Sequence, residues 1–343
     1  MEARIASRIE ILIAAFALSL SAAQPAAALD DAFAGKTITI TIGNPPGGTY
    51  DLIGRLVARH LGAHLPGRPA VIAENMPGAG SLRAAAYVFN VAPRDGTALG
   101  IVTETLAIEQ ALGNPAVQFD AGKFTWIGRV VGSNAVHIMW HTSKVHSIAD
   151  AERFPAAVAG TGAGNVSEVV PALLNAVIGT KFKIVRGYQA ANETMLAMER
   201  GEVEGAGVNW TMVKATRAQL VHDGKIIVIL QDQPVRKPDL ADVPALGELG
   251  DSVEAKQLLG LYANTGAIGR AFFAPPGLSP ATTTALREGF MAMTKDPEFL
   301  SDARKISADD LDIGRGEDVL AAVQRTLSVP QSVIARAHAI FGR

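Results

Sequence analysis

The chain has 343 residues, enough for about two domains with separate cores. Lysine and arginine number 31 against 33 aspartate and glutamate residues, and the formal net charge of −2 provides no basic surface for nucleic acid. The absence of cysteine excludes disulfides, thiolate nucleophiles and cysteine metal sites, and it suits an exported protein. We therefore expect a two-domain protein with no nucleic-acid partner.

The first 28 residues have the pattern of a signal peptide. Arg4 and Arg8 precede an apolar run at 11–20, and a run of small residues ends at Ala28. A membrane-spanning helix needs about 20 apolar residues, so this run is too short to be one. We expect cleavage near Ala28 and a soluble, periplasmic mature protein, with an uncleaved anchor as the alternative.

The first strand expected in the mature chain, 37–42, alternates threonine and isoleucine and leads into a turn at 43–48. The prolines of this turn cannot continue a strand, whereas Gly47 and Gly48 can take positive φ and expose their amides. A helix follows, with Thr49 or Asp51 as its cap, and its first N–H groups can hold a small anion such as a carboxylate. An ordinary βα turn is the alternative.

Two more strands are expected before residue 105. The strand 70–75 ends in a second glycine turn before a helix at 82–89, and the strand 98–102 ends at Thr103. Because the carboxyl ends of parallel strands share one edge of a sheet, we expect a ligand to lie outside that edge.

A second lobe is expected to begin at the extended run 136–140. A strand at 156–159 leads to a third glycine turn, 160–168, and then to an apolar helix at 169–178. The elements expected beyond it are strands at 183–185, 205–210 and 225–230, a helix at 192–200, a strand at 271–274 that returns to the first lobe, and helices at 280–294 and 316–337.

Motifs for catalysis, metals or cofactors are weak in this sequence. The third glycine of a dinucleotide-binding motif would fall at Asn165, and no Walker, H-E-x-x-H or G-x-S-x-G pattern occurs. His137 and His141 have helical spacing but no neighbouring carboxylate or cysteine to complete a metal site. Tyr188 and Trp210 end strands of the second lobe, where they can either wall an organic ligand or pack in the core.

Five segments, in this order, carry a resemblance to a known family. They are Pro-Pro-Gly-Gly-Thr-Tyr-Asp at 45–51 with Arg55, Asn-Met-Pro-Gly-Ala-Gly at 75–80, Pro-Arg-Asp-Gly at 93–96, Asp-Val-Pro at 242–244 and Ala-Pro-Pro-Gly at 274–277. The set resembles the periplasmic solute receptors of tripartite tricarboxylate transporters, also called Bug receptors. Val-Arg-Gly-Tyr at 185–188 departs from the Pro-Tyr-Lys-Gly run of many members, so the resemblance does not identify the ligand.

The resemblance implies an α/β, two-lobed periplasmic binding protein fold of type II, the Venus flytrap. Lobe one would comprise 29–133 and 270–343, and lobe two 134–269. A carboxylated solute would be held between the lobes, without metal or cofactor, and a monomeric receptor would deliver it to a membrane permease. The family loops supply Pro46, Gly47, Gly48, Thr49, Gly78, Ala79, Gly80, Thr161, Gly162, Gly164 and Asn165 as ligand contacts, and the strand ends and the first helical turn add Asp51, Asn75, Thr103, Tyr188, Asn209 and Trp210.

Asp51 has a second interpretation, because an acid in the first turn of a helix stabilises that helix by about 0.3–1 kcal/mol without touching a ligand. Two other functions also stay open. One is an exported α/β enzyme that acts on a small carboxylate in the same crevice, and the other is a solute sensor with no part in transport.

Overall fold

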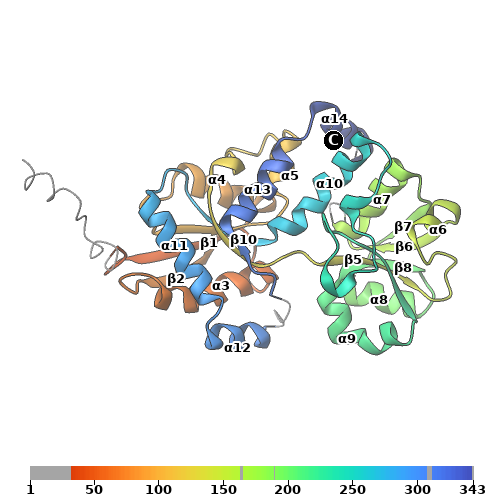
Figure 1. The fold of residues 1–343 in the computed structure, drawn as a ribbon, viewed down its shortest axis with the longest axis horizontal. Helices are drawn as coiled ribbons and strands as arrows, with labels where there is room; N and C mark the ends of the chain where they lie inside the picture. Colours follow the sequence, from red (N-terminus) through yellow and green to blue (C-terminus); the bar gives the residue numbers. More distant parts are fainter. Residues whose placement is uncertain (1–31, 163–164, 189, 307–310, 342–343) are drawn as a thin grey trace, which may run out of the picture.

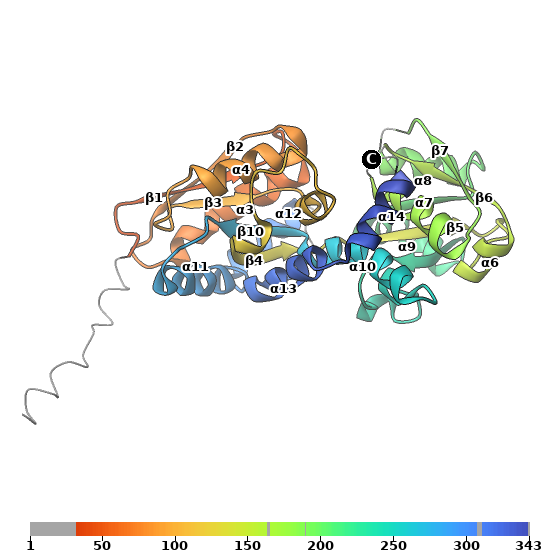
Figure 2. The same ribbon diagram turned by 90° about the horizontal axis from the view of Figure 1, so that it is seen from above.

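The computed structural model describes residues 32–162, 165–188, 190–306 and 311–341 (Figure 1). It contains two β-sheets, each covered by helices, in two lobes that lie side by side (Figures 1 and 2). The expected α/β, two-lobed fold is thus confirmed. The expected signal peptide and Gly164 lie outside the described residues.

The first lobe is built on a six-stranded sheet in the order β11-β4-β10-β3-β1-β2. Its strands are β1 (Thr37–Ile42), β2 (Ala70–Asn75), β3 (Ala98–Ile101), β4 (Thr125–Val131), β10 (Arg270–Ala274) and β11 (Gly314–Arg315). Strand β1 runs parallel to β2 and β3, whereas β10 is antiparallel to β3 and β4. Ile38, Ile40 and Ile42 are fully buried, which explains why the alternating segment forms the strand between β2 and β3.

Helices cover both faces of this sheet, and each face has its own apolar cluster. One face carries α3 (Thr49–Leu61), α11 (Pro280–Met293) and α12 (Pro297–Lys305). The other carries α4 (Leu82–Asn90), α5 (Leu106–Ala111) and α13 (Gly316–Leu327).

The second lobe has a five-stranded sheet in the order β7-β6-β8-β5-β9. Its strands are β5 (Ala135–Trp140), β6 (Ala156–Gly160), β7 (Phe182–Arg186), β8 (Gly205–Asn209) and β9 (Ile226–Gln231). Strand β6 is parallel to β7 and β8, and β5 is antiparallel to β8 and β9. The helices of this lobe are α6 (Ile148–Arg153), α7 (Val166–Ile178), α8 (Ala191–Glu199) and α9 (Trp210–His222).

Helix α10 (Val253–Ile268) lies between the lobes, where it packs on α13 of the first lobe and on α7 of the second (Figures 1 and 2). The last helix, α14 (Gln331–Phe341), also packs on α10 and α7, and its Val333 and Ile334 join the apolar core of the second lobe. The end of the chain, which we expected in lobe one, therefore contacts lobe two.

The single helix expected at 316–337 is wrong, because the structure has two helices there. Helix α13 ends at Leu327, and α14 begins at Gln331 after Pro330. Proline lacks an N–H group and its ring clashes with the preceding turn, so it ends the first helix. Among the described residues, no helix is long and apolar enough to cross a membrane.

Candidate ligand-binding site

The loops of the first lobe meet at one edge of its sheet, as the sequence predicted. The parallel strands β1, β2 and β3 end at Ile42, Asn75 and Ile101, and each is followed by a loop that leads to a helix. Strand β10 runs the other way and therefore begins at this edge, with Arg270. The carboxyl edge of parallel strands is where α/β proteins bind small ligands.

The first glycine loop is fixed from inside by Asp51, which is only 4% exposed. Its Oδ2 accepts the N–H of Gly47 at 2.9 Å, and its Oδ1 accepts Arg55 Nε and Asn75 Nδ2, each at 2.9 Å. Asn75 Nδ2 also donates to the carbonyl of Asn44 at 2.9 Å. Asp51 and Asn75 thus shape the loop through contacts within the protein, and their role as ligand contacts stays a prediction.

The two glycines of this loop have different backbone conformations. Gly47 has a φ of +86°, a conformation that favours glycine, whereas Gly48 has an extended backbone with a φ of −83° and is the N-cap of α3. Positive φ is therefore confirmed for Gly47 and is wrong for Gly48. Since Gly47 N–H is bound to Asp51, the N–H groups of Gly48 and Thr49 remain at the helix start for a ligand, with Pro46 just before them.

The second glycine loop contains four consecutive residues with positive φ: 145° at Gly78, 48° at Ala79, 61° at Gly80 and 75° at Ser81. Two of them carry side chains, and such strained backbone is found preferentially at functional sites. Ser81 Oγ lies 2.8 Å from Thr103 Oγ1 and donates to Asn44 Oδ1 at 3.1 Å. This hydroxyl therefore joins the loops that follow β1, β2 and β3.

The glycine loop of the second lobe is fixed in the same way. Glu168 is 5% exposed, its Oε1 accepts Gly162 N–H at 2.9 Å, and its Oε2 accepts Arg186 Nε at 2.8 Å. Asp51 and Glu168 are each the third residue of their helix, so each lobe places an acid in the first turn that binds back to its own glycine loop. The positive end of each helix is thereby partly neutralised before a ligand binds.

Hydroxyl groups complete this second loop. Ser167 Oγ accepts the N–H of Thr161 at 3.0 Å and lies 3.0 Å from Thr161 Oγ1. Asn165 caps α7 by accepting the N–H of Ser167 at 3.1 Å. These hydrogen bonds therefore hold the side chains of Thr161 and Asn165 in place within the loop.

The three other residues expected in the second lobe lie in different surroundings. Trp210 is 6% exposed, lies in an apolar cluster and donates from Nε1 to Asp239 Oδ2 at 2.9 Å, so most of its surface is in the core. Tyr188 is half-buried against the same cluster. Asn209 caps α9, accepting the N–H of Met212 at 3.4 Å, and also lines a cavity.

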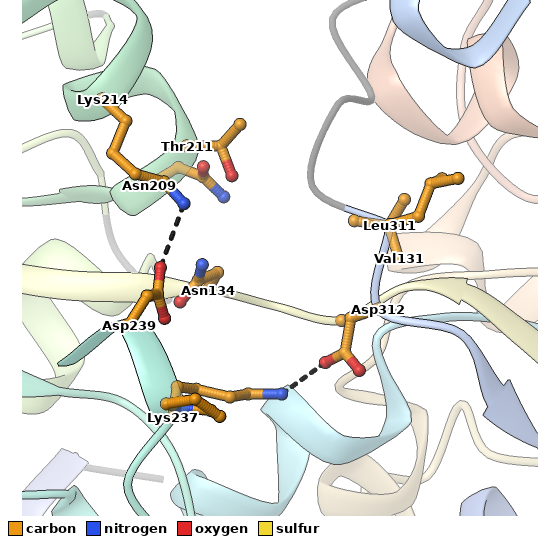
Figure 3. A pocket seen from close by; sticks show the side chains of 11 residues that line it. Val131, Asn134, Asn209, Thr211, Lys214, Lys237, Asp239, Leu311 and Asp312 are labelled. Atoms are coloured by element: carbon orange, nitrogen blue, oxygen red, sulfur yellow. Dashed lines mark hydrogen bonds and ion pairs between the residues drawn. The ribbon is translucent and has the colours of Figure 1, made fainter. Parts of the chain in front are cut away.

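That cavity, of about 340 Å³, lies between the lobes and is lined by both polar and apolar residues (Figure 3). Asn209, Thr211 and Lys214 contribute from the second lobe, and Asp312 contributes from the first. Lys237 Nζ donates to Asp312 Oδ2 at 2.5 Å across the cavity, which forms an ion pair between the lobes. Sequence analysis missed Lys237 and Asp312, because isolated charged residues on loops carry no motif.

A comparison with models of protein families identifies the family of this chain. The model of the tripartite tricarboxylate transporter family receptor, TctC, matches residues 53–318, which is more than half of the chain. The chain belongs to this family. The resemblance inferred from the five segments is thus confirmed, and TctC receptors are periplasmic solute-binding proteins. A comparison with curated proteins finds no match.

Solved structures with the same fold cover most of this receptor. A TctC solute-binding protein from Polaromonas, without ligand, is 18% identical, covers 90% of this chain and 98% of its own, and has a TM-score of 0.69. A Rhodopseudomonas palustris protein with adipate is 20% identical over 89% of this chain and 97% of its own, with a TM-score of 0.56. MatC from Rhodopseudomonas palustris, with bound malate, is also 20% identical, covers 89% and 98%, and has a TM-score of 0.52.

Proposed function

We propose that this receptor binds a small carboxylate-containing solute between its lobes in the periplasm and delivers it to a membrane permease. One observation carries the proposal: in each lobe an internal acid holds a glycine loop at the carboxyl edge of the sheet. The remaining helix N–H groups are then preorganised donors for an anion. The adipate and malate bound by two similar proteins support a carboxylate as that anion.

The lobe boundaries are part of this proposal. The expected boundaries, 29–133 with 270–343 for lobe one and 134–269 for lobe two, are kept except that α14 is assigned to lobe two, whose core it joins. The boundaries are supported by the ends of strands, since β4 ends at Val131, β5 begins at Ala135 and β10 begins at Arg270. We also propose that the receptor is a monomer, because the two lobes of a single chain would form the whole site.

The enzyme alternative finds little support in the geometry. A general base must reach its substrate with a free lone pair. The two buried acids of the glycine loops, Asp51 and Glu168, instead accept hydrogen bonds from their own loops and from arginines. Among the described residues, no group of three or more histidines and acids could hold a metal ion. We therefore propose a receptor without chemistry of its own.

Ligand binding is expected to raise the melting temperature of the mature protein. A ligand that binds only the native state stabilises it by RT ln(1 + [L]/Kd), which is about 2.7 kcal/mol at a hundredfold excess over Kd. A thermal-shift screen of mono-, di- and tricarboxylates measures this effect, and the methyl ester of each hit serves as its control. Shifts with neutral sugars or cations, and none with carboxylates, would contradict the proposed function.

Export is expected to remove the first 28 residues. The charged start, the apolar run and the small residues that end at Ala28 occur in the order that signal peptidase recognises. The intact mass of protein recovered from the periplasm of a bacterial host gives the mature N-terminus. A periplasmic species that retains the run at 11–20 would show that the segment is an anchor.

A further inference from the structure

Arg270 places a positive charge at the ligand edge of the first sheet. It is the first residue of β10, and the antiparallel register with β3 puts it beside the loop that follows β3. That loop contains Thr103 and Glu104, and the same edge carries the first glycine loop. Neither the family segments nor the strand-end argument pointed to this arginine.

The guanidinium is held by two neighbours. Its Cζ lies 5.2 Å from the centre of the Tyr50 ring, within the range of a cation–π contact. Its Nη1 lies 3.8 Å from Glu104 Oε1, and both side chains of this pair are 16% exposed. Glu104 N–H donates to the Tyr50 hydroxyl at 3.1 Å, so Tyr50 orients both members of the pair.

This pair also contains polar atoms with unused hydrogen-bonding capacity. Arg270 Nε, Arg270 Nη1 and Glu104 Oε2 are buried and have no hydrogen-bond partner among the described residues. Buried polar atoms without a partner are rare, because each gives up its hydrogen bonds to water without replacing them. Two donors and one acceptor without partners, next to each other, indicate that a further group forms hydrogen bonds with them.

We propose that Arg270 and Glu104 form a subsite for a carboxylate that carries a hydroxyl or ammonium group on the adjacent carbon. This inference rests on the proposed function. The solute carboxylate accepts from one edge of the Arg270 guanidinium, where Nη2 supplies the second of two parallel N–H donors beside Nε or Nη1. A bare carboxylate at this place would face the negative Glu104 Oε2, whereas an adjacent hydroxyl or ammonium donates to it.

The test uses calorimetry on matched pairs of acids that differ by one 2-hydroxyl group: succinate and malate, propionate and lactate, phenylacetate and mandelate. In the pairs that bind, the wild-type protein should prefer the hydroxy acid by about tenfold or more, the value of one hydrogen bond to a charged group. Glu104→Gln should reduce this preference, because it removes the negative charge that disfavours the bare carboxylate.

Variants of Arg270 test the positive charge. Arg270→Gln should weaken the binding of the preferred acid by roughly 10- to 100-fold. Arg270→Lys keeps the charge but not the planar donors, so its affinity should lie between those of Arg270→Gln and the wild-type protein. Arg59→Gln is the matched control, because its side chain is 52% exposed and pairs with Asp302. It removes the same charge from the same lobe and should leave affinity unchanged.

The outcomes separate this inference from the proposed function. If the wild-type protein binds no carboxylate, both fail. If it binds carboxylates and folded Arg270→Gln binds them equally well, the subsite is wrong and the receptor function stands. Equal affinity of wild type for both members of every pair would overturn the role of Glu104. Circular dichroism and melting temperature on each preparation report whether a variant is folded.

Discussion

Arg129→Met is expected to lower the free energy of unfolding by about 2–4 kcal/mol, because it removes one partner of a half-buried ion pair and the donor to two carbonyls. Arg129 lies on β4 and is 9% exposed. Its guanidinium donates to Asp312 O at 2.9 Å, to Asp312 Oδ1 at 2.8 Å and to the carbonyl of Ala267. Methionine fills similar space but leaves both carbonyls without this donor.

This arginine acts where the lobes are joined. Ala267 lies in α10 just before the return to the first lobe, and Asp312 carries the ion pair from Lys237 of the second lobe. A Cβ on Gly132, in the connection from β4 to β5, would lie 2.4 Å from Asp312 Oδ2, so the segments are packed tightly around the pair. We therefore expect the variant to loosen the arrangement of the lobes as well as the fold.

The stability that this cluster contributes should decrease at acidic pH. Burial raises the pKa of Asp312, but Lys237 and Arg129 outweigh that effect, and the net pKa lies below its ordinary value. A lowered pKa in the folded state contributes stability above the unfolded value of about 4, and the contribution is lost as the pH falls through the folded value. Arg129→Met should reduce this acid-sensitive part of the stability.

Urea unfolding followed by circular dichroism measures the loss, and small-angle scattering reports the arrangement of the lobes. Arg315→Met is the control, since its side chain is 69% exposed and its ion pair with Glu317 is 3.7 Å long. Such a surface pair contributes about 0–1 kcal/mol. A stability of Arg129→Met within 1 kcal/mol of wild type, together with an unchanged radius of gyration, would mean that the cluster does not hold the lobes.

The sequence predicted the strands and loops of the first lobe well, because its patterns there are local. The alternation of threonine and isoleucine identified β1 with the same ends as the structure, 37–42, and proline and glycine marked the turn that follows it. The same reasoning located β2 at 70–75. It missed β4 and α10, although Gly132 follows the strand and Ser252 and Gly269 flank the helix.

The side-chain contacts of the site could not be predicted in this way. Asp51 was consistent with a ligand contact and with a first-turn acid, and only the path of the loop shows its carboxylate returning to Gly47. Arg270 and Glu104 are 166 positions apart in the numbering, and register across β10 and β3 brings them together. Such pairs depend on tertiary structure and leave no spacing in the sequence.

Asp51→Asn is expected to weaken carboxylate binding by at least 30-fold. Both Asp51 oxygens accept hydrogen bonds, and the amide of asparagine would turn a donor toward Gly47 N–H, Arg55 or Asn75. The loss of charge-assisted bonds should cost about 2–4 kcal/mol of stability. Binding should also weaken, because the glycine loop that holds the helix N–H groups loses its internal anchor.

The pKa of Asp51 gives an independent readout of the same anchor. Burial raises this pKa, but hydrogen bonds from Gly47, Asn75 and Arg55 outweigh burial, so the net pKa lies below its ordinary value. The wild-type protein should therefore lose stability as the pH falls below about 4, and Asp51→Asn should lose less over that range. Unfolding curves at pH 7 and pH 4 measure the difference.

The exposed acid Glu74 on β2 supplies the control variant, Glu74→Gln, which removes one negative charge from the same sheet. It should change neither affinity nor stability appreciably. Glu168→Gln should repeat the binding loss of Asp51→Asn from the second lobe, because Glu168 anchors Gly162 in the same way. If Asp51→Asn is folded and binds with wild-type affinity, the internal acids do not organise the loops, and the ligand must be held by other parts of the sheet edge.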